Sequence, residues 1–152
     1  MKKTIALVVV ILLCARVFAQ QADQDGIKQT INTMFDAMRK GDSTLLRSTF
    51  AKGIAFQGVA NKKDGSVALE TEDANAFIRA VGTPHKGVWD EQVVYKDIKI
   101  DGPLASVWAP YKFYLDKTFS HCGVDVFQLM KTKDGWKIIY IVDTRRKDNC
   151  PE

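Results

Sequence analysis

Two strand-like segments and the turn between them fill the last third of the chain, in Ser120-His121-Cys122-Gly123, Gly135-Trp136-Lys137-Ile138 and Asp143-Thr144-Arg145-Arg146. Apolar residues are frequent on both sides of Asp134-Gly135, and an Asp-Gly pair between such runs is typical of a β-hairpin. The pattern therefore predicts two long antiparallel strands over residues 119–131 and 136–145.

Two further long strands precede this hairpin, over residues 88–100 and 104–115. Turn residues separate the four segments at Asp101-Gly102-Pro103 and at Asp116-Lys117. The last 65 or so residues therefore predict a meander of antiparallel strands.

The earlier part of the chain has helical periodicity instead. Apolar residues recur at helical spacing after the possible caps Asp23 and Asp25, and Gly41 occupies the expected C-terminal cap; these residues are Ile27, Ile31, Met34, Phe35 and Met38. A second helix is expected from Asp42 and presents Leu45, Leu46 and Phe50, and a third from Thr71 to Gly82, where Glu72 and Asp73 favour its N-terminus. Short strands over 54–59 and 67–70 separate them, so we expect an α+β fold with three helices on one face of a curved, mostly antiparallel sheet.

The first nineteen residues have the layout of a secretory signal peptide. Lys2 and Lys3 precede an apolar run from Ile5 to Cys14, and Val17-Phe18-Ala19 ends in the small residue that cleavage requires. A lipoprotein signal at Cys14 is disfavoured because Leu13 precedes it. We expect export to the periplasm or beyond after cleavage near Ala19, and one domain over residues 20–152.

Charge argues against several partners. Removing Lys2, Lys3 and Arg16 leaves 19 basic against 18 acidic side chains, a net charge of +1. Without a basic stripe, nucleic acid and, after cleavage, a membrane surface are not expected partners. The two histidines and two remaining thiols lack the spacing of a metal site, and no cofactor is expected.

The mature chain keeps two cysteines, Cys122 and Cys150. An even count in an oxidising compartment predicts a disulfide, which would close a loop of about 28 residues and contribute on the order of 3 kcal/mol. The alternative is a buried Cys122 and a free thiol at Cys150.

The order of elements resembles the nuclear transport factor 2-like (NTF2-like) superfamily, which includes ketosteroid isomerases and SnoaL-type cyclases. More specific segments are similar to a secreted bacterial lumazine-binding group: Asp101-Gly102-Pro103-Leu104 through Trp108, Pro110-Tyr111, Ser120-His121-Cys122-Gly123, Gly135-Trp136-Lys137-Ile138 and Asp143-Thr144-Arg145-Arg146. The resemblance covers residues 24–150 and implies a cone-shaped fold with a mostly apolar pocket, often in dimers. Ketosteroid isomerase chemistry is disfavoured, because Gly58 and Met34 occupy the positions of its base and its oxyanion donor.

The remaining catalytic candidates are His121, Asp125 and Asp143. A type I turn over Thr132-Lys133-Asp134-Gly135 would pair Thr132 with Trp136 and place Asp125 opposite Asp143, so that His121, both aspartates and Arg145 share one face. A two-residue turn at Asp134-Gly135 would shift the register by one and separate them. On a shared face, His121 could act as a general base and Arg145 could bind an anion, or Asp143 and Arg145 could form a structural ion pair.

Aromatic residues supply candidates for ligand contact. Alternation separates Val107, Ala109, Tyr111 and Phe113 from Trp108, Lys112 and Tyr114, with Pro110 marking a bulge or an edge, but it does not decide which set faces inward. For a flat heteroaromatic ligand, stacking is expected from Trp108, Tyr111 and Phe127, and hydrogen bonds from Gln57, Gln128 or Arg145.

Three functions follow, in order of preference. The first is a secreted domain that binds a small molecule such as lumazine or another pteridine-like or heteroaromatic compound, without catalysis. The second is an acid–base isomerase or lyase that uses His121 with a nearby aspartate. The third is a module that forms a homodimer or binds a protein partner.

Overall fold

The computed structural model describes residues 2–151, with side chains from residue 20 onward. The helices are α1 (Lys2–Lys40), α2 (Ser43–Thr49) and α3 (Ala74–Gly82). The strands are β1 (Phe50–Asn61), β2 (Val67–Glu72), β3 (Trp89–Val93), β4 (Asp97–Asp101), β5 (Leu104–Leu115), β6 (Thr118–Thr132) and β7 (Gly135–Thr144). This is the α+β arrangement that the sequence predicted.

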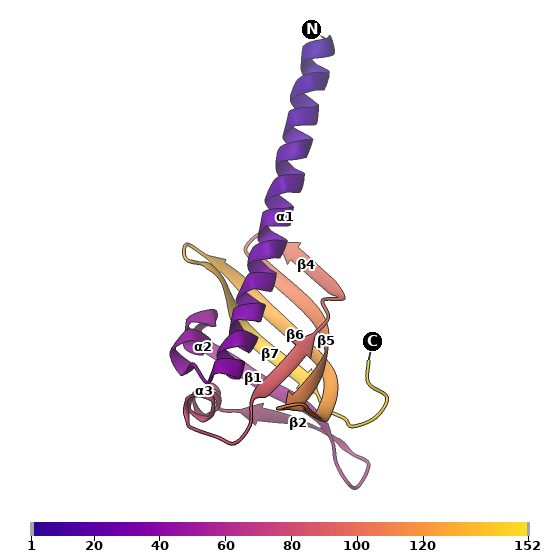
Figure 1. Ribbon diagram of the computed structural model, residues 1–152. Helices are drawn as coiled ribbons and strands as arrows, with labels where there is room; N and C mark the ends of the chain where they lie inside the picture. Colours follow the sequence, from indigo (N-terminus) through magenta and orange to yellow (C-terminus); the bar gives the residue numbers. More distant parts are fainter. Residues whose placement is uncertain (1, 152) are drawn as a thin grey trace.

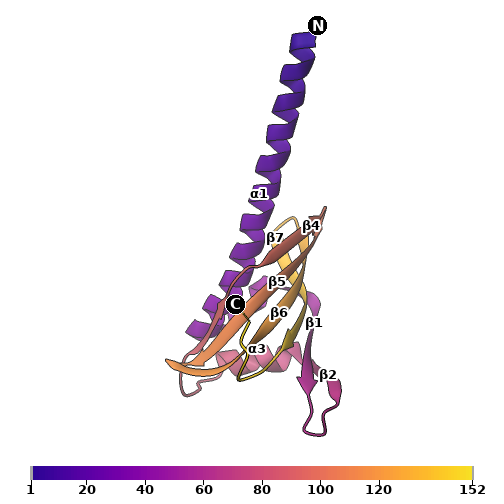
Figure 2. The same cartoon turned by 90° about the vertical axis from the view of Figure 1, so that its right-hand side faces the viewer.

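The seven strands form one curved sheet in the order β2-β1-β7-β6-β5-β3, and β4 pairs with β5 beyond the end of β3. All neighbours are antiparallel except β1 and β7, which are parallel. Figures 1 and 2 show the second half of α1 lying across one face of the sheet, with α2 and α3 beside its end. The result is a cone whose interior lies between the helices and the sheet.

The core fills most of this interior. From α1 it receives the residues predicted from the helical periodicity: Ile27, Ile31, Met34, Phe35 and Met38. From the sheet, Val107, Phe127, Leu129 and Ile138 are fully buried. On β5 the inward set is therefore that of Val107, Ala109 and Tyr111, whereas Trp108 is 51% exposed on the opposite face. The alternation of inward and outward residues continues past Pro110, because Tyr111 beyond it is still buried.

Several predicted boundaries were wrong. The long helix does not begin at Asp23 or Asp25, because α1 is continuous from Lys2; Asp23 instead accepts hydrogen bonds from Lys131 Nζ and Trp136 Nε1. The predicted cleavage near Ala19 stays a prediction. Phe50 is not part of the second helix, since it begins β1 in extended conformation.

The third helix also begins later than predicted. Glu72 is the last residue of β2, and Asp73 is the N-cap of α3, where its carboxylate accepts from the backbone N–H of Asn75 at 2.9 Å. The predicted strand over 88–100 is two strands, β3 and β4, which pair in succession with β5.

The hairpin between β6 and β7 places Asp125 opposite Asp143, but the type I turn over residues 132–135 that was expected to give this register does not form. Thr132 pairs with Gly135, not Trp136, so the turn is tighter than predicted. An irregularity beyond the pair Gln128–Tyr140 then leaves Ile139 without a partner, and this β-bulge restores the register in which Asp125 lies opposite Asp143. The bulge also lets Ile138 and Ile141 both be buried, although their spacing differs from simple alternation.

A disulfide joins Cys122 and Cys150, with a Cα–Cα distance of 5.6 Å, as the cysteine count predicted. It holds the C-terminal tail against the outer face of β6. Among the residues that the structure describes, no helix is both long enough and apolar enough to cross a membrane.

Candidate functional site

A cavity of about 80 Å³ lies inside the cone, between α1, α3 and the concave face of the sheet. Its apolar wall includes Met34, Phe35, Met38, Phe56, Phe77, Phe127 and Ile141. Its polar wall includes Glu72, Glu91, Tyr111, His121, Asp125, Asp143 and Arg145. These polar side chains come from β2, β3, β5, β6 and β7, with Arg145 just beyond the end of β7.

The predicted grouping of His121, Asp125, Asp143 and Arg145 around one cavity is present. Asp125 and Asp143 are direct cross-strand partners, and both are buried, at 5% and 9% exposure. Two carboxylates in this position repel each other unless one is protonated or a cation lies beside them.

Asp143 has such a cation. Arg145 Nε donates to Asp143 Oδ2 at 2.7 Å, and its Nη2 lies 3.3 Å from Glu72 Oε1. Partial burial disfavours the charged guanidinium, but the hydrogen bond and charge of Asp143 outweigh it and raise the pKa of Arg145 further. Arg145 is therefore part of an ion-pair cluster, in which Glu72 takes part instead of serving the N-terminus of α3.

Tyr111 supports the same carboxylate. Its hydroxyl donates to the carbonyl oxygen of Thr144 at 3.0 Å and lies 3.5 Å from Asp143 Oδ2. Burial and the surrounding carboxylates raise the pKa of Tyr111, so it stays a neutral donor. The ring lies across Gly123, where a methyl group would be 1.7 Å from the Thr144 carbonyl oxygen and 2.8 Å from the tyrosine ring. Only glycine fits this position.

Asp125 is paired differently, with Glu91 of β3. The two carboxyl groups lie within range to interact, and they can hydrogen-bond only when one of them carries a proton. Burial raises the pKa of Glu91 to about 7, and the charge of Asp143 adds to this rise. Burial, together with the charge of Glu91, also raises the pKa of Asp125 well above its usual range. The two groups thus form a carboxyl pair that shares a proton near neutral pH.

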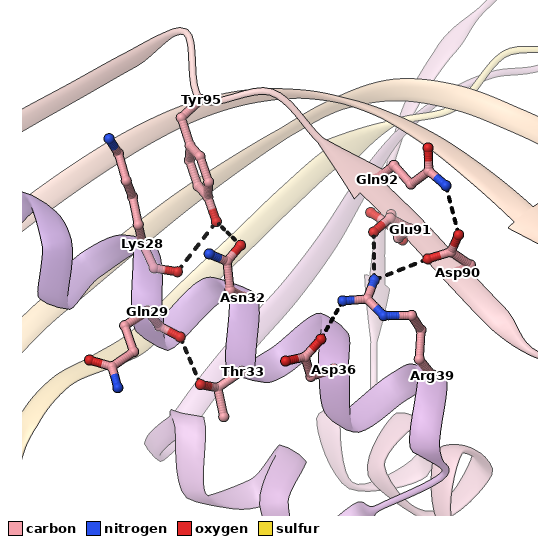
Figure 3. Close-up of polar contacts among 10 residues, drawn as sticks. All are labelled: Lys28, Gln29, Asn32, Thr33, Asp36, Arg39, Asp90, Glu91, Gln92 and Tyr95. Carbon is pink, nitrogen blue, oxygen red and sulfur yellow. Dashed lines mark hydrogen bonds and ion pairs between the residues drawn. The ribbon is translucent and has the colours of Figure 1, made fainter.

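Glu91 was not predicted as a site residue. It is held in place through its backbone, because Arg39 of α1 donates to the Glu91 carbonyl oxygen at 3.3 Å, to Asp90 at 3.0 Å and to Asp36 at 2.5 Å (Figure 3). Its position in Trp89-Asp90-Glu91-Gln92-Val93 was the available signal, since alternation places Glu91 on the face of the apolar residues Trp89 and Val93.

His121 lies in the cavity wall without a carboxylate partner. Its ring stacks on Phe113 at a centroid distance of 4.9 Å, and its Nδ1 is 3.1 Å from Ser120 Oγ. Among the described residues it makes no hydrogen bond with an aspartate, so the predicted histidine–aspartate dyad is not assembled. Burial and the charge of Arg145 lower the pKa of His121, which favours the neutral ring.

The ligand-contact candidates divide into two groups. Tyr111, Phe127, Gln57 and Arg145 border the cavity, although the Gln57 amide is already bonded to Tyr140 and Thr71. Trp108 and Gln128 do not border it: Trp108 is exposed on the outer face, and Gln128 donates to Ser106 there.

Gly58 and Met34 are the residues at the predicted positions of the ketosteroid isomerase base and oxyanion donor. Gly58 lies beside Asp143 on the neighbouring parallel strand, and Met34 contributes an apolar side chain to the cavity. Over the described residues, no cluster of His, Cys, Asp and Glu is arranged to hold a metal ion.

The curved sheet, the three helices and the enclosed cavity define an NTF2-like protein. The family model described as "Putative lumazine-binding" matches residues 22–142, so the chain belongs to that family. No curated protein sequence matches it significantly.

Solved structures support the fold. A protein of unknown function from Mycobacterium tuberculosis is similar with a TM-score of 0.70 at 15% identity, covering 88% of this chain and 77% of its own. An NTF2-like protein with a cystatin-like fold from Novosphingobium aromaticivorans has a TM-score of 0.67 at 14% identity, covering 87% and 86%. An NTF2-like protein from Shewanella baltica has a TM-score of 0.64 at 17% identity, covering 84% and 96%. At these identities the likeness concerns the fold alone.

Proposed function

We propose that this protein is an exported domain that binds a small organic molecule inside the cone. The observation that carries the proposal is the cavity itself, in which an apolar wall meets a group of polar side chains. Ligand pockets typically have this composition, with a few polar groups that fix the orientation of an apolar body. Membership of the lumazine-binding family and the disulfide agree with a ligand-binding role outside the cytoplasm.

The size of the cavity limits the ligand. At about 80 Å³ it is smaller than typical ligand pockets, which are roughly 300–1,000 Å³. A single ring fits this space more readily than the two fused rings of lumazine. Met34 and Met38 border the cavity, and unbranched methionine side chains can rearrange to admit a larger ligand.

A cavity-filling variant tests the proposal. Met34→Trp places a larger side chain in the cavity, and we expect saturable binding of lumazine or a monocyclic aromatic probe to weaken at least about 10-fold, which corresponds to about 1.4 kcal/mol. Isothermal titration calorimetry measures the affinity. Met130→Trp on the outer face is the matched control and should bind like the wild type, because Met130 is 39% exposed and does not border the cavity. Equal affinities of the two variants, or no saturable binding by any probe, would contradict the proposal.

A second candidate is an acid–base enzyme, and the observation that favours it is the carboxyl pair. A carboxylate with a pKa of about 7 in an apolar cavity is suited to proton transfer near neutral pH. In this candidate the general base is Glu91, paired with Asp125, and not His121, which the sequence suggested. The predicted homodimer stays a prediction.

A general base in the cavity can be tested without knowledge of the natural substrate by adding 5-nitrobenzisoxazole. Removal of its C–H proton breaks the N–O bond and releases a coloured phenolate. If Glu91 is a working base, the rate rises with pH through about 7, and Glu91→Gln lowers it by at least about 10-fold while His121→Gln does not. If the wild type binds the probe saturably and its rate equals that of Glu91→Gln at every pH, the enzymatic candidate is removed.

A further inference from the structure

The charges around the cavity are unbalanced. Four carboxyl groups border it, those of Glu72, Glu91, Asp125 and Asp143, whereas Arg145 is the one guanidinium among the lining residues. His121 adds no positive charge near neutral pH, because its pKa is lowered. Even with one proton shared between Glu91 and Asp125, the lining carries an excess of negative charge. A ligand with an anionic group therefore meets repulsion.

The single guanidinium is already in use. Arg145 contacts Asp143 at 2.7 Å and Glu72 at 3.3 Å, and these two carboxylates more than balance its charge. The sequence had suggested that Arg145 binds an anionic group, but an incoming anion would have to displace one of these partners. Arg145 thus belongs to the wall of the cavity and is not an open anion site.

Among the side chains that the structure describes, no other cation contacts the carboxyl groups of Glu91 and Asp125. Arg39 lies near β3, but its contacts are the main-chain carbonyl of Glu91 and the carboxylates of Asp90 and Asp36 (Figure 3). The side chains of Glu91 and Asp125 therefore interact with each other, with Asp143 and Tyr111 in the same lining.

The Asp125 carboxyl group has a buried oxygen atom without an N–H or hydroxyl partner. Its Oδ2 atom is enclosed in a residue that is only 5% exposed, and no N–H or hydroxyl group of the described residues donates to it, which leaves a protonated Glu91 carboxyl as its one donor within the protein. Buried polar atoms almost always have a partner, and leaving one without costs about 1–3 kcal/mol. An N–H donor from a ligand would remove this cost.

We propose that the ligand is a small organic cation, with an apolar ring or chain against the phenylalanine and methionine wall and an amidinium or ammonium group that donates N–H bonds to Glu91 and Asp125. This inference rests on the proposed function, because it names the class of molecule that the same cavity takes. It differs from the lumazine expectation, since lumazine is neutral and presents carbonyl oxygens as well as N–H groups.

Proton loss from the pair strengthens binding of a cation. As the pH rises through about 7, Glu91 ionises while Asp125 keeps the shared proton, so a cation gains a carboxylate partner and its affinity increases. The other titratable or charged groups that act on the pair are Asp143, Arg145 and Tyr111 in the cavity lining and Asp90 next to Glu91 on β3, whereas His121 borders the cavity as a neutral ring. Arg145 and Tyr111 keep their protons across this range because their pKa values are raised, so their charges are constant.

Three probes of equal shape test the inference: benzamidine, benzamide and benzoate carry a cationic, a neutral and an anionic group on the same ring. We expect benzamidine to bind at least about 10-fold more tightly than benzamide at pH 8, and benzoate to bind more weakly than either. Glu91→Gln and Asp125→Asn should each remove most of the preference for benzamidine. Glu70→Gln is the matched control, because Glu70 is exposed and paired with Lys62, outside the cavity lining.

The outcomes separate the two proposals. If benzamide or benzoate binds as tightly as benzamidine, and Met34→Trp still weakens that binding, the cavity binds ligands but the cation preference is wrong. If benzamidine binds best and Glu91→Gln does not change the preference, the carboxyl pair is not the site. If no probe binds saturably to the wild type or the Met130→Trp control, both proposals fail. Thermal unfolding of each variant verifies that the loss of preference occurs in folded protein.

Discussion

Asp125 and Asp143 face each other on two neighbouring strands, but the groups around the two carboxylates differ. Asp143 is neutralised by a guanidinium 2.7 Å away and lies near the Tyr111 hydroxyl. Asp125 has no cation and contacts a second carboxyl, Glu91. The two sites are equally deep, at 9% and 5% exposure, so burial does not explain the difference.

The comparison separates a structural ion pair from a site prepared for something else. A protein can satisfy a buried aspartate completely with its own side chains, as it does at Asp143. At Asp125 it does not, and the cost of burying a second acidic group beside it opposes folding. Groups whose burial disfavours folding are often found where a protein binds or transforms a ligand. This contrast is the physical basis for assigning ligand contact to the Glu91–Asp125 pair and a supporting role to Asp143 and Arg145.

The largest effect is expected from breaking the Asp143 side of the comparison. Arg145→Gln removes the cation from a carboxylate whose side chain is 11% exposed, and it leaves that charge beside Asp125. We expect the free energy of unfolding to fall by about 2 kcal/mol, less than the 3–5 kcal/mol typical of a fully buried pair because the Arg145 side chain is 57% exposed. Urea denaturation at pH 7 measures the change.

Arg79→Gln is the matched control for this loss. Arg79 pairs with Asp73 on the surface, with side-chain exposures of 68% and 58%, and such pairs contribute about 0–1 kcal/mol. The double variant Asp143→Asn with Arg145→Gln should recover part of the lost stability, because no uncompensated charge remains. If Arg145→Gln costs no more than Arg79→Gln, the two aspartates do not differ in the way proposed.

The sequence predicted the surroundings of Asp143, whereas it predicted only part of the surroundings of Asp125. The face shared by His121, Asp125, Asp143 and Arg145 follows from strand alternation in β6 and β7, together with the assumption that Asp125 lies opposite Asp143. The sequence left two registers open, and the turn that was expected to place Asp125 opposite Asp143 does not form. A tighter turn and a bulge at Ile139 compensate for each other, and bulges depend on tertiary packing that a local pattern does not encode.

Glu91 could not be assigned because its partner is distant in the sequence. Alternation in β3 places it on a face with Trp89 and Val93, but whether that face is inside depends on how β3 pairs with β5. For the same reason, the sequence did not decide whether Trp108 or Tyr111 faces inward, because either set of alternating residues on their strand could face the core. The helical periodicity of α1 needed no such information, since its apolar residues all lie on one side of a single helix.

The smaller effect concerns the Glu91 side and depends on pH. The pKa of Glu91 is raised from its ordinary value of 4.5 to about 7 in the folded protein, so the folded state binds its proton more tightly than the unfolded state. The stability associated with this proton is fully present below about pH 4.5 and is lost as the pH rises to about 7. Glu91→Gln resembles the protonated residue at every pH and lacks this loss.

The variant and the wild type should therefore be about equally stable at pH 4.5. At pH 8 Glu91→Gln should be more stable by about 1–2 kcal/mol, less than the roughly 3 kcal/mol that a pKa of about 7 against 4.5 implies for a fully enclosed group, because Glu91 is only partly buried. Urea denaturation of both proteins at several pH values gives the difference directly, and the comparison cancels the titration of carboxyls that the two proteins share. Glu70→Gln, whose carboxylate is exposed and has its pKa lowered by Lys62, should show no gain at pH 8. A constant difference between Glu91→Gln and wild type across this range would mean that Glu91 titrates normally, and the contrast between Asp125 and Asp143 would then lose its electrostatic basis.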